Sequence, residues 1–200
     1  MKPIKKAFLA VLILVMAAIN ITSAQPVSWK IDPYHSQVRF SVTHMVISEV
    51  EGSFKKYEGK ITSEGNDFAK ASVEFRIDVS SINTDNEMRD NHLKSDDFFN
   101  AAQYPFITFK STSLKKLDEK NYELKGNFTI RDVTKPVTFK ATYGGQVKDP
   151  YGNTKAAFNV TGHVSRLDYN LKWNALLESG GAVVSDQVNF NASVELTKEK

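Results

Sequence analysis

A hydrophobic period of two residues constrains the fold of this chain more than any other feature. Apolar and polar side chains alternate in six segments, 38–42, 73–79, 122–130, 137–143, 156–164 and 188–196. Successive side chains of a β-strand point to opposite faces, so this alternation predicts strands with one apolar and one solvated face. Segments 51–61 and 106–111 are further candidates, which gives about eight strands.

The connections between the expected strands are short and polar. Turn-forming residues cluster at 64–67, 118–121 and 149–153, so strands adjacent in sequence should pair as antiparallel neighbours. The expected fold class is therefore all-β, as a sandwich or as a barrel, and only a closed barrel removes the edges. Gly126 and Gly162 stand at inward-facing positions, where they either leave room in the interior or allow the strands to bend.

One segment breaks the alternation. Residues 84–99 read TDNEMRDNHLKSDDFF, which predicts a short helix with Thr84 or Asp85 as its N-cap. Five acidic and two basic side chains lie between positions 85 and 97. If this segment borders an opening, its negative charge should disfavour a pyrophosphate headgroup and accept a neutral one, such as a quinone, more easily.

The N-terminus has the layout of a secretory signal peptide. Three lysines precede an apolar run at 7–18, and small residues end at Ala24, so we expect residues 1–24 to be removed and residues 25–200 to form one exported domain. An uncleaved anchor is the alternative. Removal of the lysines lowers the formal net charge from +3 to about zero, which argues against a nucleic-acid partner. The absence of cysteine excludes disulfides and thiol chemistry.

Five ordered segments resemble the YceI-like polyisoprenoid-binding proteins. They are DPYHSQVRFSVTHMVISEVEGSF from Asp32, DNHLKSDDFFNAAQYPFITFKST from Asp90, GNFTIRDVTKPVTF from Gly126, SRLDYNLKWN from Ser165 and VSDQVNFNASVEL from Val184. The resemblance implies a lipocalin-like antiparallel β-barrel of about eight strands with a short helix near one end. It also implies an exported, periplasmic or secreted, protein that binds isoprenoid or other long-chain lipids. Asp132 departs from the glycine common at its position and should alter only that turn.

The expected ligand-binding residues are the inward apolar set and four residues near the barrel ends. The inward set comprises Val38, Phe40, Val42, Val73, Phe75, Ile77, Phe128, Phe139, Phe158 and Phe190, and the others are His44, His92, Phe99 and Trp173. Each methylene removed from water contributes about 0.8 kcal/mol. Immobilising a ligand costs roughly 4–15 kcal/mol, so a tail of about twenty carbons is favoured over a short one. A filled core without a cavity is the alternative reading of the same residues.

The sequence gives little indication of metal binding or catalysis. The four histidines show no metal-ligand spacing, no known catalytic motif occurs, and neither a metal nor a cofactor is expected. His44 shares the inward parity of Val42 and, as a polar residue at the end of an apolar cavity, could hydrogen-bond a lipid headgroup; a purely structural role is the alternative. Trp173, Leu176 and Leu177 lie in an apolar loop that lines a cavity mouth, meets a membrane or partner, or plugs the barrel.

The sequence therefore favours a non-enzymatic carrier of a long-chain isoprenoid or quinone-like lipid. Two alternatives remain: an enzyme that modifies such a lipid through His44, His92 or a nearby acid, and a solid barrel that binds another protein. Transient membrane contact and homodimerisation stay open, as do the identity of the lipid and the end at which the barrel opens.

Overall fold

The computed structural model describes residues 25–65, 67–178 and 180–199. The expected signal peptide, residues 1–24, lies outside the described residues. Within the described part, no helix combines the length and the apolarity that a membrane span requires.

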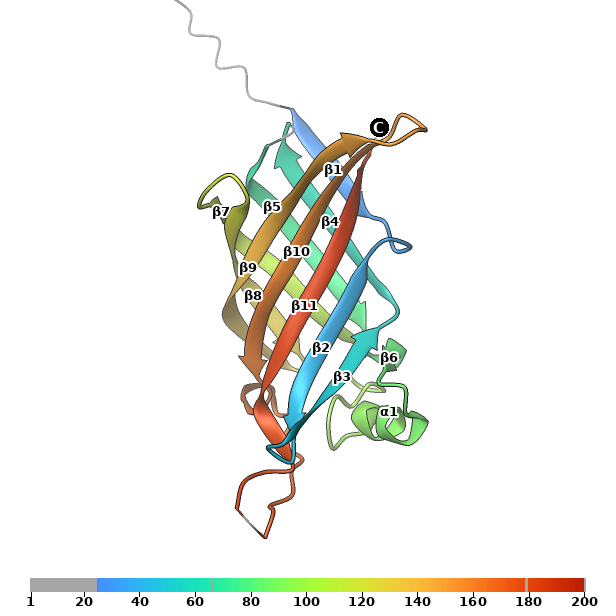
Figure 1. Cartoon of the computed structure of the whole chain (residues 1–200), viewed down its shortest axis with the longest axis vertical. Coiled ribbons are helices and arrows are strands. Elements are labelled where there is room, and N and C mark those ends of the chain that lie inside the picture. The colour runs from blue at the N-terminus through green and yellow to red at the C-terminus, as the bar shows by residue number, and fades with distance from the viewer. Residues whose placement is uncertain (1–24, 66, 179, 200) are drawn as a thin grey trace, which may run out of the picture.

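The strands form a closed antiparallel barrel of eight strands, as the sequence predicts. The wall closes where β1 pairs with β11 (Figure 1). The segments are β1 (Pro26–Ile31), β2 (Gln37–His44), β3 (Ser48–Phe54), β4 (Tyr57–Glu64), β5 (Asp67–Asp78), β6 (Ile82–Asn83), β7 (Phe106–Lys116), β8 (Asn121–Ile130), β9 (Val133–Lys148), β10 (Thr154–Ser165) and β11 (Val184–Lys198).

Three of the eight barrel strands are interrupted. Each of these three consists of two segments that follow one another along the barrel wall. In the first, β1 and β2 both pair with β11. In the second, β4 pairs with β1 and β3 pairs with β2, and in the third, β5 pairs with β4 and β6 pairs with β3. The expected single strand at 51–61 is therefore divided at Lys55 and Lys56 into β3 and β4. β1 and the two-residue β6 were not predicted, because neither contains a run of alternation long enough to recognise.

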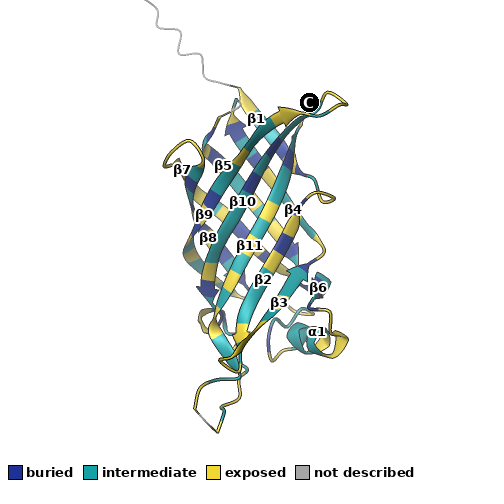
Figure 2. Cartoon of the chain, in the orientation of Figure 1, coloured by how far each residue is buried: buried dark blue, intermediate teal, exposed yellow. Residues whose placement is uncertain are grey.

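Burial follows the alternation along the strands (Figure 2). On β8, for example, Tyr122, Leu124, Phe128 and Ile130 are buried, whereas Lys125 and Asn127 between them are exposed. The inward side chains form one hydrophobic core that runs along the barrel axis. The inward and outward parities expected from the sequence are confirmed for these strands.

Phenyl rings occupy the space beside the inward glycines. A Cβ atom at Gly126 would meet the ring of Phe109, and one at Gly162 would meet the ring of Phe139. The room that the glycines leave is thus filled by rings of neighbouring strands, which lie against the wall instead of across the interior. Gly162 thus makes room for a ring, whereas Gly126 also lies opposite a register shift between Ser111 and Ser113 of β7, so both expectations apply there.

The helix α1 (Glu87–Lys94) lies beside one end of the barrel, here named the lower end (Figure 1). The β2–β3 turn and the segments 171–178 and 180–183 project from the same end, and the C-terminus lies at the opposite, upper end. Asn86 is the N-cap and accepts a hydrogen bond from the Arg89 amide, so the helix starts later than predicted from Thr84 or Asp85.

Two arginines fasten the loops of the lower end. Arg131 donates through Nη1 to the carbonyl oxygens of Asp96, Phe98 and Asn170. Arg166 is buried and donates to four carbonyl oxygens, in 171, 173, 184 and 185. Charged donors on several carbonyls hold irregular backbone in place where no strand ladder can. The short helices η1 (Val79–Ser81) and η2 (Leu167–Tyr169) complete this end.

Candidate lipid-binding cavity

A cavity of about 130 Å³ lies inside the barrel, and the surface that lines it is wholly apolar. Eight of the expected ligand-binding residues line it: Val38, Val73, Phe75, Ile77, Phe128, Phe139, Phe158 and Phe190. They come from strands on all sides of the barrel. Among the described residues that line the cavity there is no histidine, aspartate or glutamate.

Small side chains on β9, β10 and β11 give the cavity its space. Ala141, Val160 and Ala192 line it and are flanked by Gly162. Ala192 and Val160 face inward and are nevertheless only half-buried. These residues were missed by the sequence reasoning, although they continue the parity of Phe158 and Phe190, because small apolar side chains did not stand out as candidates.

A cluster of aromatic rings closes the cavity toward the upper end. Phe68 lies 5.0 Å from Trp29, 5.8 Å from Tyr143 and 4.9 Å from Phe158, measured between ring centroids. The indole Nε1 of Trp29 donates to Ser63 Oγ at 2.8 Å, so the one polar atom of this fully buried ring is satisfied. The upper end is therefore a packed plug.

The other six expected residues lie below the cavity and do not line it: Phe40, Val42, His44, His92, Phe99 and Trp173. Phe54 joins two of them, with ring centroids 5.5 Å from Phe40 and 6.2 Å from Phe99. His44 is the last residue of β2, next to the turn, and does not line the cavity, so its role at a lipid headgroup stays a prediction. The inward parity is correct, but the strand runs past the end of the cavity.

Trp173 belongs to a ring cluster that covers the lower end. Its ring centroid lies 5.1 Å from His92 and 5.4 Å from Phe98, and the side chain is half-buried. His92 Nε2 hydrogen-bonds Asp97 Oδ2 at 2.8 Å, which orients the imidazole. Trp173 therefore packs as part of a cover over the lower end of the barrel. Leu176, by contrast, is 87% exposed and does not belong to this cover.

The barrel wall is incomplete beside this cover. β3 pairs with β2 along its whole length, but its ladder with β6 includes only Ser53 and Phe54. The apolar inner face next to the free edge, at Phe40, Val42 and Val50, is accordingly half-buried. This side of the lower end is where the interior is least completely covered.

The cavity is small for a long lipid. Its volume of about 130 Å³ is close to the roughly 150 Å³ of an engineered cavity that binds benzene. Sites for larger ligands have roughly 300–1,000 Å³. A chain of about twenty carbons therefore requires side chains of the interior to move apart.

A charged cluster lies on the outer face, where Asp32, His35 and Glu195 place their ligand atoms within 4.8 Å of one another. The sequence showed no such metal-ligand set. Lys155 Nζ stands 2.9 Å from Asp32 Oδ2 and 3.1 Å from Glu195 Oε1, so one ammonium group forms ion pairs with both carboxylates. The hydrogen bonds from Lys155 and His35 hold the pKa of Asp32 well below its usual range. The cluster fastens the β1–β2 link to β10 and β11.

Comparisons with known proteins agree with this architecture. The family model of the YceI-like domain matches residues 29–196. A UPF0312 protein of Staphylococcus aureus is 36% identical over 167 residues, which cover 83% of this chain and 95% of that protein. A YceI protein of Campylobacter jejuni shares 30% identity, with a TM-score of 0.67 over 79% of this chain and 90% of that one.

A more distant similarity concerns the fold alone. A polyisoprenoid-binding domain from Saccharophagus degradans, implicated in plant cell wall breakdown, is 15% identical. It superposes with a TM-score of 0.66 and covers 86% of this chain and 98% of that domain.

Proposed function

The chain belongs to the YceI-like family, and we propose that it is an exported carrier that holds one long-chain isoprenoid lipid inside its barrel. The observation that carries the proposal is the wholly apolar cavity at the centre of the barrel. A hydrocarbon chain satisfies such a lining, whereas a polar ligand would lose its hydrogen bonds to water without replacement. The polyisoprenoid-binding domain from Saccharophagus degradans has the same fold, which adds support.

The quinone or polyprenol type is the preferred cargo. The lower end carries Asp96, Asp97 and Asp132 close to the cover formed by Trp173, with Lys172 and Arg131 as the nearby bases. A neutral headgroup avoids the repulsion that a pyrophosphate would meet there. The headgroup is placed at the lower end because that end has the less complete wall.

Entry of the lipid requires the interior to widen. Phe128 contacts Phe139, Tyr169 and Phe190 through edge-to-face ring pairs, with centroids 5.9, 5.9 and 5.6 Å apart. These rings separate the cavity from the lower end. Their displacement would join the cavity to the half-buried inner face at Phe40 and Val42 without breaking a backbone ladder.

Cleavage after Ala24 would deliver the barrel to the periplasm or the exterior, where a carrier moves lipid between membranes by transient contact. A homodimer is compatible with this function but not required by it.

An enzyme that modifies the lipid is the less favoured function. A general acid or base has to come within hydrogen-bond reach of the reacting atom. His44 and His92 both lie below the cavity, and none of the described residues that line the cavity is an acid or a histidine. A binding role needs only the apolar interior.

Filling the cavity tests the proposal. Ala192→Leu on β11 should occupy part of the cavity, and Ser193→Leu should place the same side chain on the exposed outer face of the same strand. Tryptophan-fluorescence titration with geranylgeraniol should show affinity reduced at least tenfold for Ala192→Leu and unchanged for Ser193→Leu. Equal affinities for the two variants would contradict a ligand site inside the barrel.

A further inference from the structure

The turn between β2 and β3 is built from residues that do not suit its backbone. Met45 and Val46 adopt left-handed conformations, with φ of 51° and 67°, and the Ile47 amide donates to the His44 carbonyl oxygen. Two consecutive left-handed residues define a type I′ turn, which strongly prefers Asn-Gly. Positive φ is a genuine outlier for a β-branched residue such as valine. Local folding therefore disfavours the side chains found here.

The exposure of these apolar side chains to water is also unfavourable. Val46 is 66% exposed and Ile47 is 87% exposed, so both side chains gain little stability from packing. Residues that are unfavourable both for the backbone and for the exposed surface are expected where a functional contact requires them.

A second segment extends this surface. Residues 175–178 and 180–183 lie side by side as a small hairpin, in which Leu176 bridges to Ala182. The Met45 amide donates to the Val183 carbonyl oxygen at 2.8 Å. A Cβ atom at Gly181 would lie 3.1 Å from Val46 Cγ2, so the two segments touch. We name Met45, Val46, Ile47 and Leu176 the apolar tip, which projects from the lower end of the barrel (Figure 1).

We propose that the apolar tip docks the protein onto a lipid bilayer with little anionic lipid, where it exchanges its cargo. This inference rests on the proposed carrier function and adds the surface by which the carrier meets the membrane. The tip lies at the end where β3 has a free edge, so docking would bring the least covered part of the interior to the bilayer.

The size and shape of the tip favour a bilayer over a protein partner. A stable protein interface takes roughly 20–30 residues from each side and about 800 Å² per partner. Four exposed apolar side chains on a projecting turn and hairpin supply far less. A bilayer needs no matching surface, because apolar side chains of a convex tip enter the boundary between headgroups and acyl chains individually.

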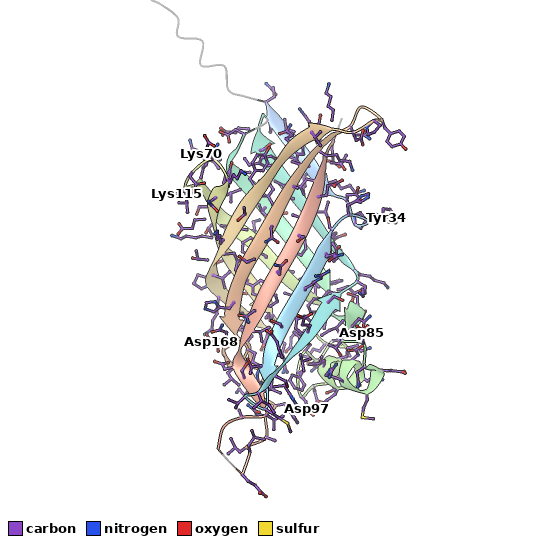
Figure 3. The ribbon with its side chains drawn as sticks, viewed as in Figure 1. Tyr34, Lys70, Asp85, Asp97, Lys115 and Asp168 are labelled. Atoms are coloured by element: carbon purple, nitrogen blue, oxygen red, sulfur yellow. The ribbon has the colours of Figure 1, made fainter. Side chains whose placement is uncertain are left out.

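The charge around the tip identifies the kind of bilayer. The loops of the lower end, within 43–49, 78–106, 130–135 and 165–187, contain eleven acidic and six basic residues. Figure 3 shows Asp85, Asp97 and Asp168 toward this end, whereas Lys70 and Lys115 lie toward the opposite end. An anionic surface would repel this charge, so binding should come from apolar insertion and should not depend on basic residues.

A matched pair of substitutions tests the docking surface. Val46 and Val147 are equally exposed, at 66% and 65%, but Val147 lies near the upper end of β9. Asn tolerates the left-handed conformation, so Val46→Asn should fold at least as stably as the wild type. Flotation with phosphatidylcholine vesicles should show binding about tenfold weaker for Val46→Asn. Val147→Asn should bind like the wild type.

Further measurements distinguish a lipid bilayer from a second copy of the chain as the partner of the apolar tip. Binding should disappear in the triple variant Val46→Asn/Ile47→Asn/Leu176→Asn and should weaken when phosphatidylglycerol is added to the vesicles. Wild-type protein that does not float with phosphatidylcholine vesicles, or Val46→Asn that floats equally well, would overturn the docking proposal. So would a wild-type dimer in sedimentation that Val46→Asn dissociates in the absence of vesicle binding, because the tip would then contact a second copy of the chain.

Uptake of geranylgeraniol from vesicle-free solution separates this inference from the carrier function. Val46→Asn should take up the lipid like the wild type, since Val46 does not line the cavity. Failure of the wild type to take up geranylgeraniol contradicts the carrier function, whereas loss of vesicle binding alone contradicts only the docking surface.

Discussion

The ring of Phe139 on β9 lies directly against the α-carbon of Gly162 on β10, so closely that a Cβ atom at position 162 would overlap Cδ1 of the ring. Phe139 also lines the cavity. The glycine therefore lets a large ring lie flat on the barrel wall and keeps the centre of the interior open. Cavity space in this barrel depends on where its aromatic rings lie as much as on how many there are.

Gly162→Ala should move the Phe139 ring into the cavity. Overpacking of this kind typically costs about 1–3 kcal/mol of stability, and the smaller interior should weaken geranylgeraniol binding about tenfold. Gly144→Ala on β9 is the control, because its Cβ atom would meet Ala157 at 3.2 Å and no ring of the cavity. Calorimetric titration of both variants checks the prediction, and equal loss of binding in the two would contradict it.

Phe190→Ala should change stability and affinity in opposite directions. Loss of a phenyl ring from a core typically lowers the free energy of unfolding by about 3–5 kcal/mol, and the half-buried position of Phe190 places it at the lower limit. The enlarged cavity needs less displacement of rings by a long lipid, so affinity should rise. Urea denaturation and lipid titration of the same preparation measure both effects. A simultaneous fall in stability and affinity would show that the ring itself grips the ligand.

Trp173→Ala should act on the rate at which lipid leaves. Because the Trp173 ring packs on His92 and Phe98 over the lower end, its loss opens the cover while the cavity lining stays intact. Stopped-flow displacement should show faster dissociation of geranylgeraniol, with little change in the melting temperature. Unfolding of the variant would instead identify Trp173 as part of the stabilising plug.

Arg131→Met should loosen the lower end far more than Lys135→Met. Arg131 donates to three backbone carbonyl oxygens, and hydrogen bonds from charged groups contribute about 1.5–3 kcal/mol. The Lys135–Asp168 pair is largely exposed and contributes at most about 1 kcal/mol. Hydrogen exchange should accelerate at residues 96–104 and 168–173 in Arg131→Met alone. Similar exchange in the two variants would argue against the role given to Arg131.

The cluster of Asp32 and His35 should make stability depend on pH. The hydrogen bond to Asp32 raises the pKa of His35, so its contribution is complete below the unfolded pKa of about 6.5 and disappears as pH rises through the raised value. The lowered pKa of Asp32 means that its own contribution is present above about pH 4 and is lost in stronger acid. The difference in melting temperature between wild type and His35→Gln should be largest near pH 5 and vanish near pH 9. A constant difference over this range would exclude the ion pair as its cause.

Period-two alternation was sufficient to predict the long strands and their inward faces, because each of them has one apolar and one solvated side, but it missed the short β1 and β6. It also predicted cavity residues such as Phe128 and Phe190 correctly. It could not locate the cavity along the barrel axis, since parity is the same above and below it. For this reason it could not show that His44 lies beyond the residues that line the cavity.

The remaining omissions have similar physical causes. Ala192 and Ala141 line the cavity, and their small side chains leave space in it. The sequence pattern of a small apolar residue in a strand does not distinguish a position beside a cavity from one packed against an aromatic ring. The Asp32–Lys155–Glu195 network joins three segments far apart in sequence, so no local spacing reveals it. The closeness of such groups follows from strand order and register, which the sequence pattern does not supply.

The decisive test of lipid carriage is native mass spectrometry of the protein purified from its own compartment, followed by extraction and analysis of bound lipid. We expect one long-chain isoprenoid with a neutral headgroup per barrel, and its loss in Ala192→Leu. A protein that is isolated empty and takes up neither quinone nor polyprenol would contradict the carrier function and would leave a barrel whose interior serves only as a core.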